Sequence, residues 1–211
     1  MTDARSTRFS APLRLEGTRL LLRPLVAGDA TPLSRAGGDP EIWKFMRTGP
    51  VTDSRAMARL IEMLLGRQSE GTDLAFTIVE QVSGTPIGMT RFLHIDRDND
   101  AVEVGGTWLA RRFWRGPYNT ESKLLMLRHA FEVERVHRVE LRTDLRNERS
   151  QWAIQRLGAT REGVLREESL LGDGYRRSTV VYSILEDEWP MVRDRLVRFL
   201  RRPWVARSAT G

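Results

Sequence analysis

Residues 101–123 constrain the fold most, because they join a strand, a basic turn and the start of a helix in one stretch. The apolar run from Ala101 to Leu109 is typical of a strand. The turn at 111–118, RRFWRGPY, carries three arginines, and a helix opens directly afterwards at Asn119. This order places free backbone N–H groups and the positive end of a helix dipole beside guanidinium groups. The stretch therefore predicts a binding site for an anion such as a pyrophosphate.

Composition narrows the class of protein. A chain of 211 residues with 40% apolar content can form one well-packed domain. The absence of cysteine excludes disulfides, thiolate metal sites and a cysteine nucleophile, and three histidines offer little to a metal. No run approaches the roughly 20 apolar residues that a membrane span needs, and the polar segment 1–12 lacks the apolar core of a signal peptide. We predict a cytoplasmic protein with no metal and no membrane partner.

The charge is basic, with a formal net charge of +6 and a pI near 10.6. Such a balance would suit a nucleic-acid partner, but the arginines are scattered and aromatic residues do not interleave with them. Nucleic acid is therefore a disfavoured partner. Lysine is nearly absent, with only Lys44 and Lys123, and we infer no function from this bias.

Hydrophobic periodicity predicts a mixed α/β chain without repeats or long linkers. A flexible tail is expected over 1–12, the main domain over 13–188, and a basic amphipathic helix with a tail over 189–211. The predicted strands are 18–25, 74–80, 86–95, 101–109, 137–143, 161–170 and 176–185. The predicted helical segments are 28–35, 40–46, a firmer helix from Thr52 or Asp53 that Gly66 and Gly71 close, 119–134, 147–157 and 187–201.

The last helix places Val192, Leu196, Phe199 and Leu200 on one face. Packing of this face on its own domain, or on a second copy of the chain in a homodimer, is favoured over a membrane or another partner.

Five short segments in order carry a resemblance to a known family. They are LEGTRLLLRP at 15–24, GTWL at 106–109, NTE at 119–121, NERS at 147–150 and LGA at 157–159. The chain resembles the GNAT superfamily of acyl-CoA-dependent N-acyltransferases over about 13–188, and within it the branch of the RimJ and RimL ribosomal-protein acetyltransferases. The resemblance implies an α/β fold with a central, splayed, mostly antiparallel sheet of about seven strands flanked by helices. It also implies acetyl-CoA as donor and a primary amine as acceptor.

One departure from the family affects the phosphate loop. The pattern Gln/Arg-x-x-Gly-x-Gly/Ala corresponds here to residues 114–119, so both small positions are changed, to Pro117 and Asn119. Pro117 offers no N–H, whereas Asn119 adds a side chain that can cap the helix. We expect acetyl-CoA binding to be retained. The predicted acetyl-CoA ligands are Trp108, Leu109, Arg112, Arg115, Gly116, Tyr118, Asn119, Thr120 and Asn147.

The chemistry needs an unprotonated amine, a donor to the oxyanion and a proton for the leaving thiolate. Without cysteine, direct attack in a ternary complex is the natural mechanism. A backbone N–H near Trp108 and Leu109 is the expected oxyanion donor. Glu103, on the same strand, is the leading base, because the histone-acetylating members carry a glutamate at this spacing. The alternative for Glu103 is an outward-facing carboxylate paired with an arginine, and the two readings weigh equally.

Ser150 shares a helix face with Ala153, Ile154 and Leu157, so it is expected to face inward. The resemblance implies that this serine donates a proton to the CoA sulfur and that Asn147 holds the pantetheine. The alternative is a helix cap with a first-turn serine.

The other polar candidates favour structural roles. His94, His129 and His137 are expected at the surface, with His94 nearest the acceptor. Glu121 is expected to complement the helix dipole, and Asp96, Asp98 and Asp100 to form a turn. Trp43, Phe45 and Met46 are more typical of core than of an acceptor pocket.

An N-acetyltransferase is the leading functional prediction, with a peptide N-terminus, an aminoglycoside or polyamine, or a small metabolite as acceptor. A non-catalytic acyl-CoA-binding or scaffold protein is the alternative, and a basic nucleic-acid module a weaker third.

Overall fold

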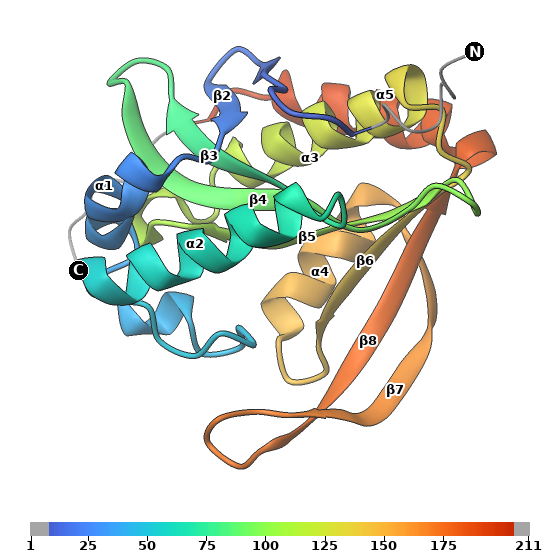
Figure 1. Cartoon of the computed structure of the whole chain (residues 1–211). Helices are drawn as coiled ribbons and strands as arrows, with labels where there is room; N and C mark the ends of the chain where they lie inside the picture. Colours follow the sequence, from blue (N-terminus) through green and yellow to red (C-terminus); the bar gives the residue numbers. More distant parts are fainter. Residues whose placement is uncertain (1–8, 205–211) are drawn as a thin grey trace, which may run out of the picture.

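The computed structural model describes residues 9–204, in which eight strands form one mixed sheet (Figure 1). The strand order is β1-β2-β3-β4-β5-β6-β8-β7, and all neighbours are antiparallel except β5 and β6. The strands are β1 (Leu15–Glu16), β2 (Leu20–Pro24), β3 (Leu74–Glu80), β4 (Thr85–Asp96), β5 (Ala101–Leu109), β6 (Arg138–Asp144), β7 (Thr160–Leu170) and β8 (Arg176–Leu185). The predicted seven strands are confirmed. The eighth, β1, is too short to show a periodic pattern.

Helices cover both faces of the sheet (Figure 1). On one face lie α1 (Ala30–Ala36) and α2 (Ser54–Ser69), and on the other lie α3 (Tyr118–Arg128), α4 (Glu148–Leu157) and α5 (Trp189–Leu200). Short helical turns are η1 (Ala27–Asp29), η2 (Pro40–Ile42), η3 (Arg111–Phe113), η4 (His129–Val133), which has π geometry, and η5 (Glu186–Glu188).

Helix α2 begins at a capping side chain and runs past a predicted stop. The carboxylate of Asp53 accepts the backbone N–H of Ala56 at the start of α2, at 2.8 Å, as predicted. Of the two glycines predicted to close α2, Gly66 lies inside the helix, which continues to Ser69, whereas Gly71 follows the C-cap with a φ of +73° and confirms that part of the prediction. A glycine inside a helix costs about 1 kcal/mol relative to alanine. The buried face of Met57, Ile61 and Leu64 outweighs that cost, since it attaches the whole helix to the sheet.

The sheet separates two apolar clusters, one on each face. The larger lies between the sheet and α3, α4 and α5, and includes Phe76, Phe92, Val104 and Tyr182. The smaller lies under α1 and α2 and includes Met57 and the paired rings of Trp43 and Trp108, whose centroids are 5.1 Å apart. Because β5 contributes to both clusters, its position between the two helical layers is fixed.

Phe9, at the start of the described chain, and helix α5, near its end, both pack against the core. Phe9 is 5% exposed and lies edge-on to Phe92, so the predicted flexible tail over 1–12 does not hold at Phe9. The rest of that prediction up to residue 8 lies outside the described residues. Helix α5 buries Trp189, Val192 and Leu196 against the core, which confirms the packing of this face on its own domain. The predicted C-terminal tail beyond residue 204 is not described.

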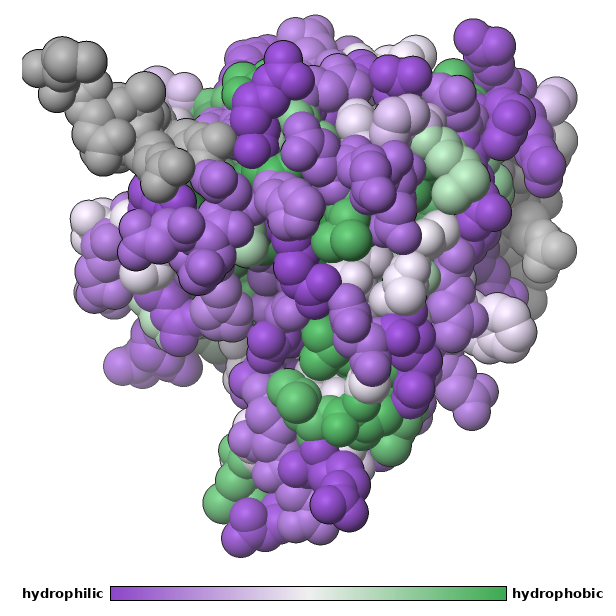
Figure 2. Space-filling model, turned by 90° about the vertical axis from the view of Figure 1, so that its right-hand side faces the viewer, coloured by the Kyte–Doolittle hydropathy of each residue, from purple (hydrophilic) through white to green (hydrophobic). Residues whose placement is uncertain are grey.

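The surface seen in Figure 2 is mostly hydrophilic, with hydrophobic residues gathered towards its lower end, where the β7–β8 hairpin projects. This hairpin carries the exposed Leu165 and Leu170. The predicted homodimer stays a prediction. No helix within residues 9–204 is long and apolar enough to cross a membrane.

Candidate functional site

The sheet opens between β5 and β6, and this opening forms the main cleft. The two strands pair only where Ala101–Glu103 meet Arg138–Glu140, and β5 then continues to Leu109 without β6 (Figure 1). A bulge in the β4–β5 ladder lies at Gly106, whose φ of +56° favours glycine. A Cβ atom there would also approach Arg91 Nε to 2.6 Å. The cleft has a volume of about 1210 Å³.

The backbone of Leu109 turns its polar groups into the opening. Ala110 N–H donates to the carbonyl of Ile87 on β4 at 2.8 Å. Because an antiparallel ladder alternates, the groups of the preceding residue, Leu109, point away from β4. Its carbonyl accepts Nε1–H of Trp114 at 2.8 Å, which confirms this direction. The N–H of Leu109 therefore points to the side where β6 has diverged.

The first turn of α3 leaves backbone donors free at one end of the cleft. Pro117 precedes the helix without a side-chain cap, and the first intrahelical bond is from Glu121 N–H to Pro117. The N–H groups of Tyr118, Asn119 and Thr120 therefore have no intrahelical acceptor. Asn119 does not cap the helix as predicted, because it lies inside the first turn, where its half-buried side chain lines the cleft.

Two arginines from α4, which the sequence analysis missed, complete this basic region. Arg149 lies with its guanidinium carbon 3.5 Å from the ring centroid of Trp114, and burial lowers its pKa. Arg156 donates to Thr120 Oγ1 at 3.1 Å, so it reaches the first turn of α3. Both line the cleft together with Arg115. Their helix is distant in sequence from the basic turn, so no local pattern could link them.

The structure separates the predicted acetyl-CoA ligands into two groups. Arg112 is exposed and lies over the ring of Phe113, away from the cleft lining, while the Tyr118 ring is buried against Phe113 and Trp204. The Thr120 side chain is buried as well, so only the backbone N–H groups of Tyr118 and Thr120 remain as donors. The cleft is lined by Trp108, Leu109, Arg115, Gly116, Asn119 and Asn147.

Ser150 and Asn147 lie at the start of α4. Asn147 is the N-cap, and its Oδ1 accepts the backbone N–H of Ser150 at 3.1 Å. Ser150 lines the cleft with Ala153 and Ile154, as the predicted inward-facing stripe requires. Its hydroxyl bonds no other group among the described residues, so it is available to a ligand.

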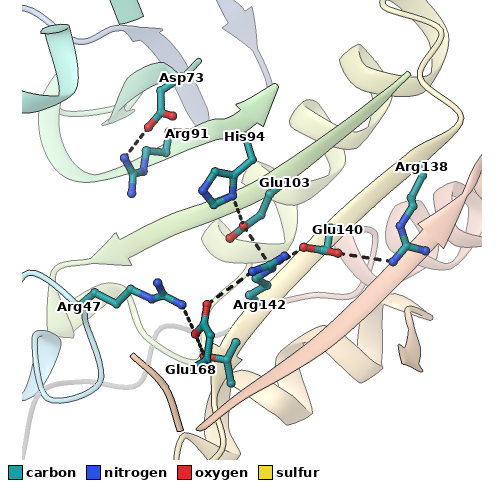
Figure 3. A network of polar contacts seen from close by, with 10 residues as sticks. Arg47, Asp73, Arg91, His94, Glu103, Arg138, Glu140, Arg142 and Glu168 are labelled. Atoms are coloured by element: carbon teal, nitrogen blue, oxygen red, sulfur yellow. Dashed lines mark hydrogen bonds and ion pairs between the residues drawn. The ribbon is translucent and has the colours of Figure 1, made fainter. Parts of the chain in front are cut away.

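Glu103 lies at the closed end of the cleft within a network of charges (Figure 3). Its carboxylate is 2.9 Å from His94 Nδ1 and 3.6 Å from Arg142 Nε, and the residue is 7% exposed. The hydrogen bond to Glu103 raises the pKa of His94, despite the opposing effect of burial. Glu103 therefore pairs with an arginine, as one of the two predictions states. It also lines the cleft, as the other prediction requires. Its histidine partner, His94, was expected to have little role.

Further ion pairs extend this network across β6 and β8 (Figure 3). Arg142 pairs with Glu140, and Arg47, from the loop before α2, pairs with Glu168 of β7 at 2.5 Å. Glu168 also accepts the hydroxyl of Thr179 at 2.9 Å. Ion pairs thus run from Glu103 on β5 through Arg142 on β6 to Glu168 on β7 and Arg47.

Lys123 is a buried amine that the sequence analysis did not select. It projects from α3 towards β5, where Nζ donates to Thr107 Oγ1 at 2.6 Å, and it lines the cleft. Burial lowers its pKa from the usual 10.5 to about 7, although the charge of Glu103 opposes this shift. An amine that is partly neutral near pH 7 can accept a proton. Only burial distinguishes Lys123 from the exposed Lys44, and burial depends on the tertiary fold.

The acidic turn before β5 is confirmed, and Glu121 has a second role beside the one predicted. Asp96 accepts the backbone N–H groups of Asp98 and Asn99, as expected of a turn. Glu121 binds the backbone N–H groups of Thr18 and Arg19, so it anchors the segment before β2 as well as lying in the first turn of α3.

The predictions for the histidines and for Trp43, Phe45 and Met46 are confirmed at some residues and wrong at others. His129 is buried and bonds Glu134 at 2.9 Å, so its predicted surface position is wrong, whereas His137 is exposed. Trp43 is core, as favoured, while Phe45 and Met46 line the cleft.

Comparisons with known proteins identify the family. Residues 19–160 match the family described as Acetyltransferase (GNAT) domain. The uncharacterized N-acetyltransferase p20 of Bacillus licheniformis is 29% identical over 149 residues, which cover 71% of this chain and 83% of that protein. A T. thermophilus protein of known crystal structure, classed as an acetyltransferase, is 40% identical with a TM-score of 0.82, over 90% of this chain and 98% of its own. The chain belongs to the GNAT acetyltransferase family.

The fold extends to more distant relatives. Mycobacterium smegmatis RimJ, solved in complex with CoA-disulfide, is 22% identical with a TM-score of 0.78, over 92% of this chain and 98% of its own. GNAT enzymes use acetyl-CoA as donor, so the predictions of a GNAT fold and of an acetyl-CoA-dependent N-acetyltransferase are confirmed.

Proposed function

We propose that this protein transfers the acetyl group of acetyl-CoA to a primary amine by direct attack within a ternary complex. The observation that carries this proposal is the opening beside β5, which brings an outward-facing backbone N–H, a basic helix terminus and titratable side chains into one cleft. The absence of cysteine from the chain removes an acyl-cysteine route, which supports direct attack.

The anion site at α3 suits the pyrophosphate of CoA. The orphan N–H groups of Tyr118, Asn119 and Thr120 and the guanidinium groups of Arg115 and Arg149 provide donors and positive charge. This set supports binding even though Pro117 has replaced a small residue of the family pattern. Asn147, whose Oδ1 caps α4, lines the cleft and is the proposed partner of the pantetheine through its amide NH2.

Three groups carry the proposed reaction. The N–H of Leu109 stabilises the oxyanion that forms when the amine nitrogen attacks the thioester carbonyl. Glu103 takes the proton released by the amine through a water relay, since it lies at the closed end of the cleft. Ser150 gives a proton to the departing thiolate. Lys123, between β5 and α3, is a second group able to accept a proton near neutral pH.

Calorimetric titration with acetyl-CoA, followed by a screen of amines for thiol release, tests this function. We expect micromolar binding and turnover of at least one amine class. A ligand at about 100 times its Kd adds about 2.7 kcal/mol of stability, so thermal melting provides an independent measure. Binding without turnover of any amine would favour a non-catalytic acyl-CoA-binding protein. Absence of binding would refute the assignment of the anion site.

A further inference from the structure

Arg177 is a buried cation in the cleft that the proposed reaction does not use. It is the second residue of β8, is 6% exposed and lines the cleft. Val180, Tyr182 and Ile184 of the same strand belong to the large core, so Arg177 lies on the opposite face of the sheet. Glu103 lies on that face too, since its neighbours Val102 and Val104 face the core.

The guanidinium of Arg177 has no hydrogen-bond partner among residues 9–204. Its Nε is buried without a partner, and the nearest carboxylate oxygen, Asp144 Oδ2, is 3.9 Å away. Asp144 is already held by Arg146, at 2.9 Å to Nη2 and 3.0 Å to Nε. Buried polar groups are normally satisfied, and an unsatisfied one requires an explanation.

The carboxylates near Arg177 in the cleft already have other partners (Figure 3). Glu168 is bound by Arg47 and Glu140 by Arg142, while Glu103 is bound by His94. Each of these carboxylates thus has a closer partner than Arg177, and the arginine that pairs with Glu103 is Arg142, at 3.6 Å. An anion that enters the cleft would meet a guanidinium whose hydrogen-bond donors are not occupied by the protein.

Arg177 and Leu109 lie beyond the point where β5 and β6 stop pairing, one on each side of the opening. From the pair of Glu103 and Glu140, β5 runs six residues to Leu109, a distance of about 20 Å. In the same direction, β6 runs four residues to Asp144, which pairs with Thr179, and Arg177 lies two residues further along β8. Arg177 and Leu109, whose N–H is proposed to bind the thioester oxygen, therefore line the same opening, each six residues along the strands from the last β5–β6 pair.

We propose that the acceptor is a primary amine that also carries a carboxylate, and that Arg177 binds this carboxylate while the amine faces the thioester. The inference rests on the proposed function and names the substrate class of the same cleft. A guanidinium suits a carboxylate because its planar fork donates two parallel hydrogen bonds. A carboxylate bound by Arg177 holds the amine of the same molecule in the opening that the Leu109 N–H faces. A short acceptor, such as an amino acid, is then sufficient.

Matched pairs of amines test the proposal. The panel consists of an amino acid, a dipeptide and a tripeptide, each supplied with a free carboxyl terminus and as its carboxamide. We expect at least one free acid to exceed its amide by tenfold or more in kcat/KM. The Arg177→Gln variant is expected to remove this preference mainly through KM, while the amide rates stay near the wild-type value. Arg177→Lys, which keeps the charge without the fork, is expected to fall between the two.

Arg138→Gln is the control, because Arg138 lies on the same sheet, pairs with Glu140 and Glu162, and is not part of the cleft lining. It is expected to leave the preference unchanged. Equal use of acids and amides, or a preference that survives in Arg177→Gln, would overturn the proposal. Acetyl-CoA affinity is measured for each variant. An unchanged affinity shows that the variant is folded and that any change in the acid preference does not come from weaker acetyl-CoA binding.

Product binding decides the matter if no member of the panel is acetylated. With CoA present, the N-acetylated free acids are expected to raise the melting temperature of the wild type but not of Arg177→Gln. The absence of any shift in the wild type, or an equal shift in both proteins, would refute the carboxylate subsite. Failure of acetyl-CoA itself to bind would instead refute the proposed function.

Discussion

Replacement of Lys123 by methionine should change how the stability of the protein depends on pH. In the folded state the pKa of Lys123 is about 7, whereas in the unfolded chain it returns to about 10.5. Between these values the unfolded chain binds more protons than the folded one, so the free energy of unfolding rises with pH. The wild type therefore loses stability as the pH falls from 10.5 towards 7, and Lys123→Met lacks this contribution.

The magnitude follows from the burial of the amine. Each pH unit inside the window changes the free energy of unfolding by about 1.4 kcal/mol. From pH 7.5 to pH 9.5 the wild type should gain about 2–3 kcal/mol relative to Lys123→Met. The lost hydrogen bond to Thr107 adds an offset of about 1 kcal/mol that does not depend on pH over this window.

Urea denaturation at four pH values from 7.5 to 9.5 measures this difference. Lys44→Met is the matched control, because Lys44 is the only other lysine and is exposed. Its stability curve should run parallel to that of the wild type. A difference between wild type and Lys123→Met that stays constant across the range would refute the argument that burial depresses this pKa.

Three further predictions concern the cleft. Ser150→Ala should lower kcat by about tenfold or more with nearly unchanged acetyl-CoA affinity, in line with general-acid effects of about 10²–10⁴; a wild-type kcat would exclude the acid role. Glu103→Gln should lower the pKa of His94, measured by NMR titration of the imidazole, because its hydrogen bond to the carboxylate is lost, and should lower kcat, since the carboxylate is the proposed proton acceptor. An unmoved His94 titration would contradict the first effect, and an unchanged kcat would return Glu103 to a structural role. Pro117→Gly should tighten acetyl-CoA binding a few-fold in calorimetry, since it restores a backbone N–H; weaker binding would show that Pro117 preorganises the loop.

Local patterns in the sequence were sufficient for most of the fold. Alternating apolar residues marked the strands, and Asp53 and Asn147 marked helix starts because capping is a contact between near neighbours. The inward face of Ser150 followed from helical spacing alone. The sequence offered both Gly66 and Gly71 as the end of α2, because a local helix penalty does not include the packing that carries the helix past Gly66.

The charged half of the cleft depended on contacts between distant segments. Arg149 and Arg156 reach the proposed anion site only because the fold brings α4 near Trp114 and the first turn of α3, and Glu103 meets His94 only through the β4–β5 pairing. Burial, which gives Lys123 its low pKa, is a property of the packed domain.

The sequence by itself determined the elements, their order, the basic turn before α3 and the family resemblance, because each is encoded in residues close along the chain. The tertiary structure decided which cations are paired and which are left for a ligand. The parallel pairing of β5 with β6 ends after Glu103, and the width and charge of the resulting cleft arise from strands that 28 residues separate in the sequence. Electrostatic environment depends on distances in space, and these are fixed only when the sheet and its helices pack together.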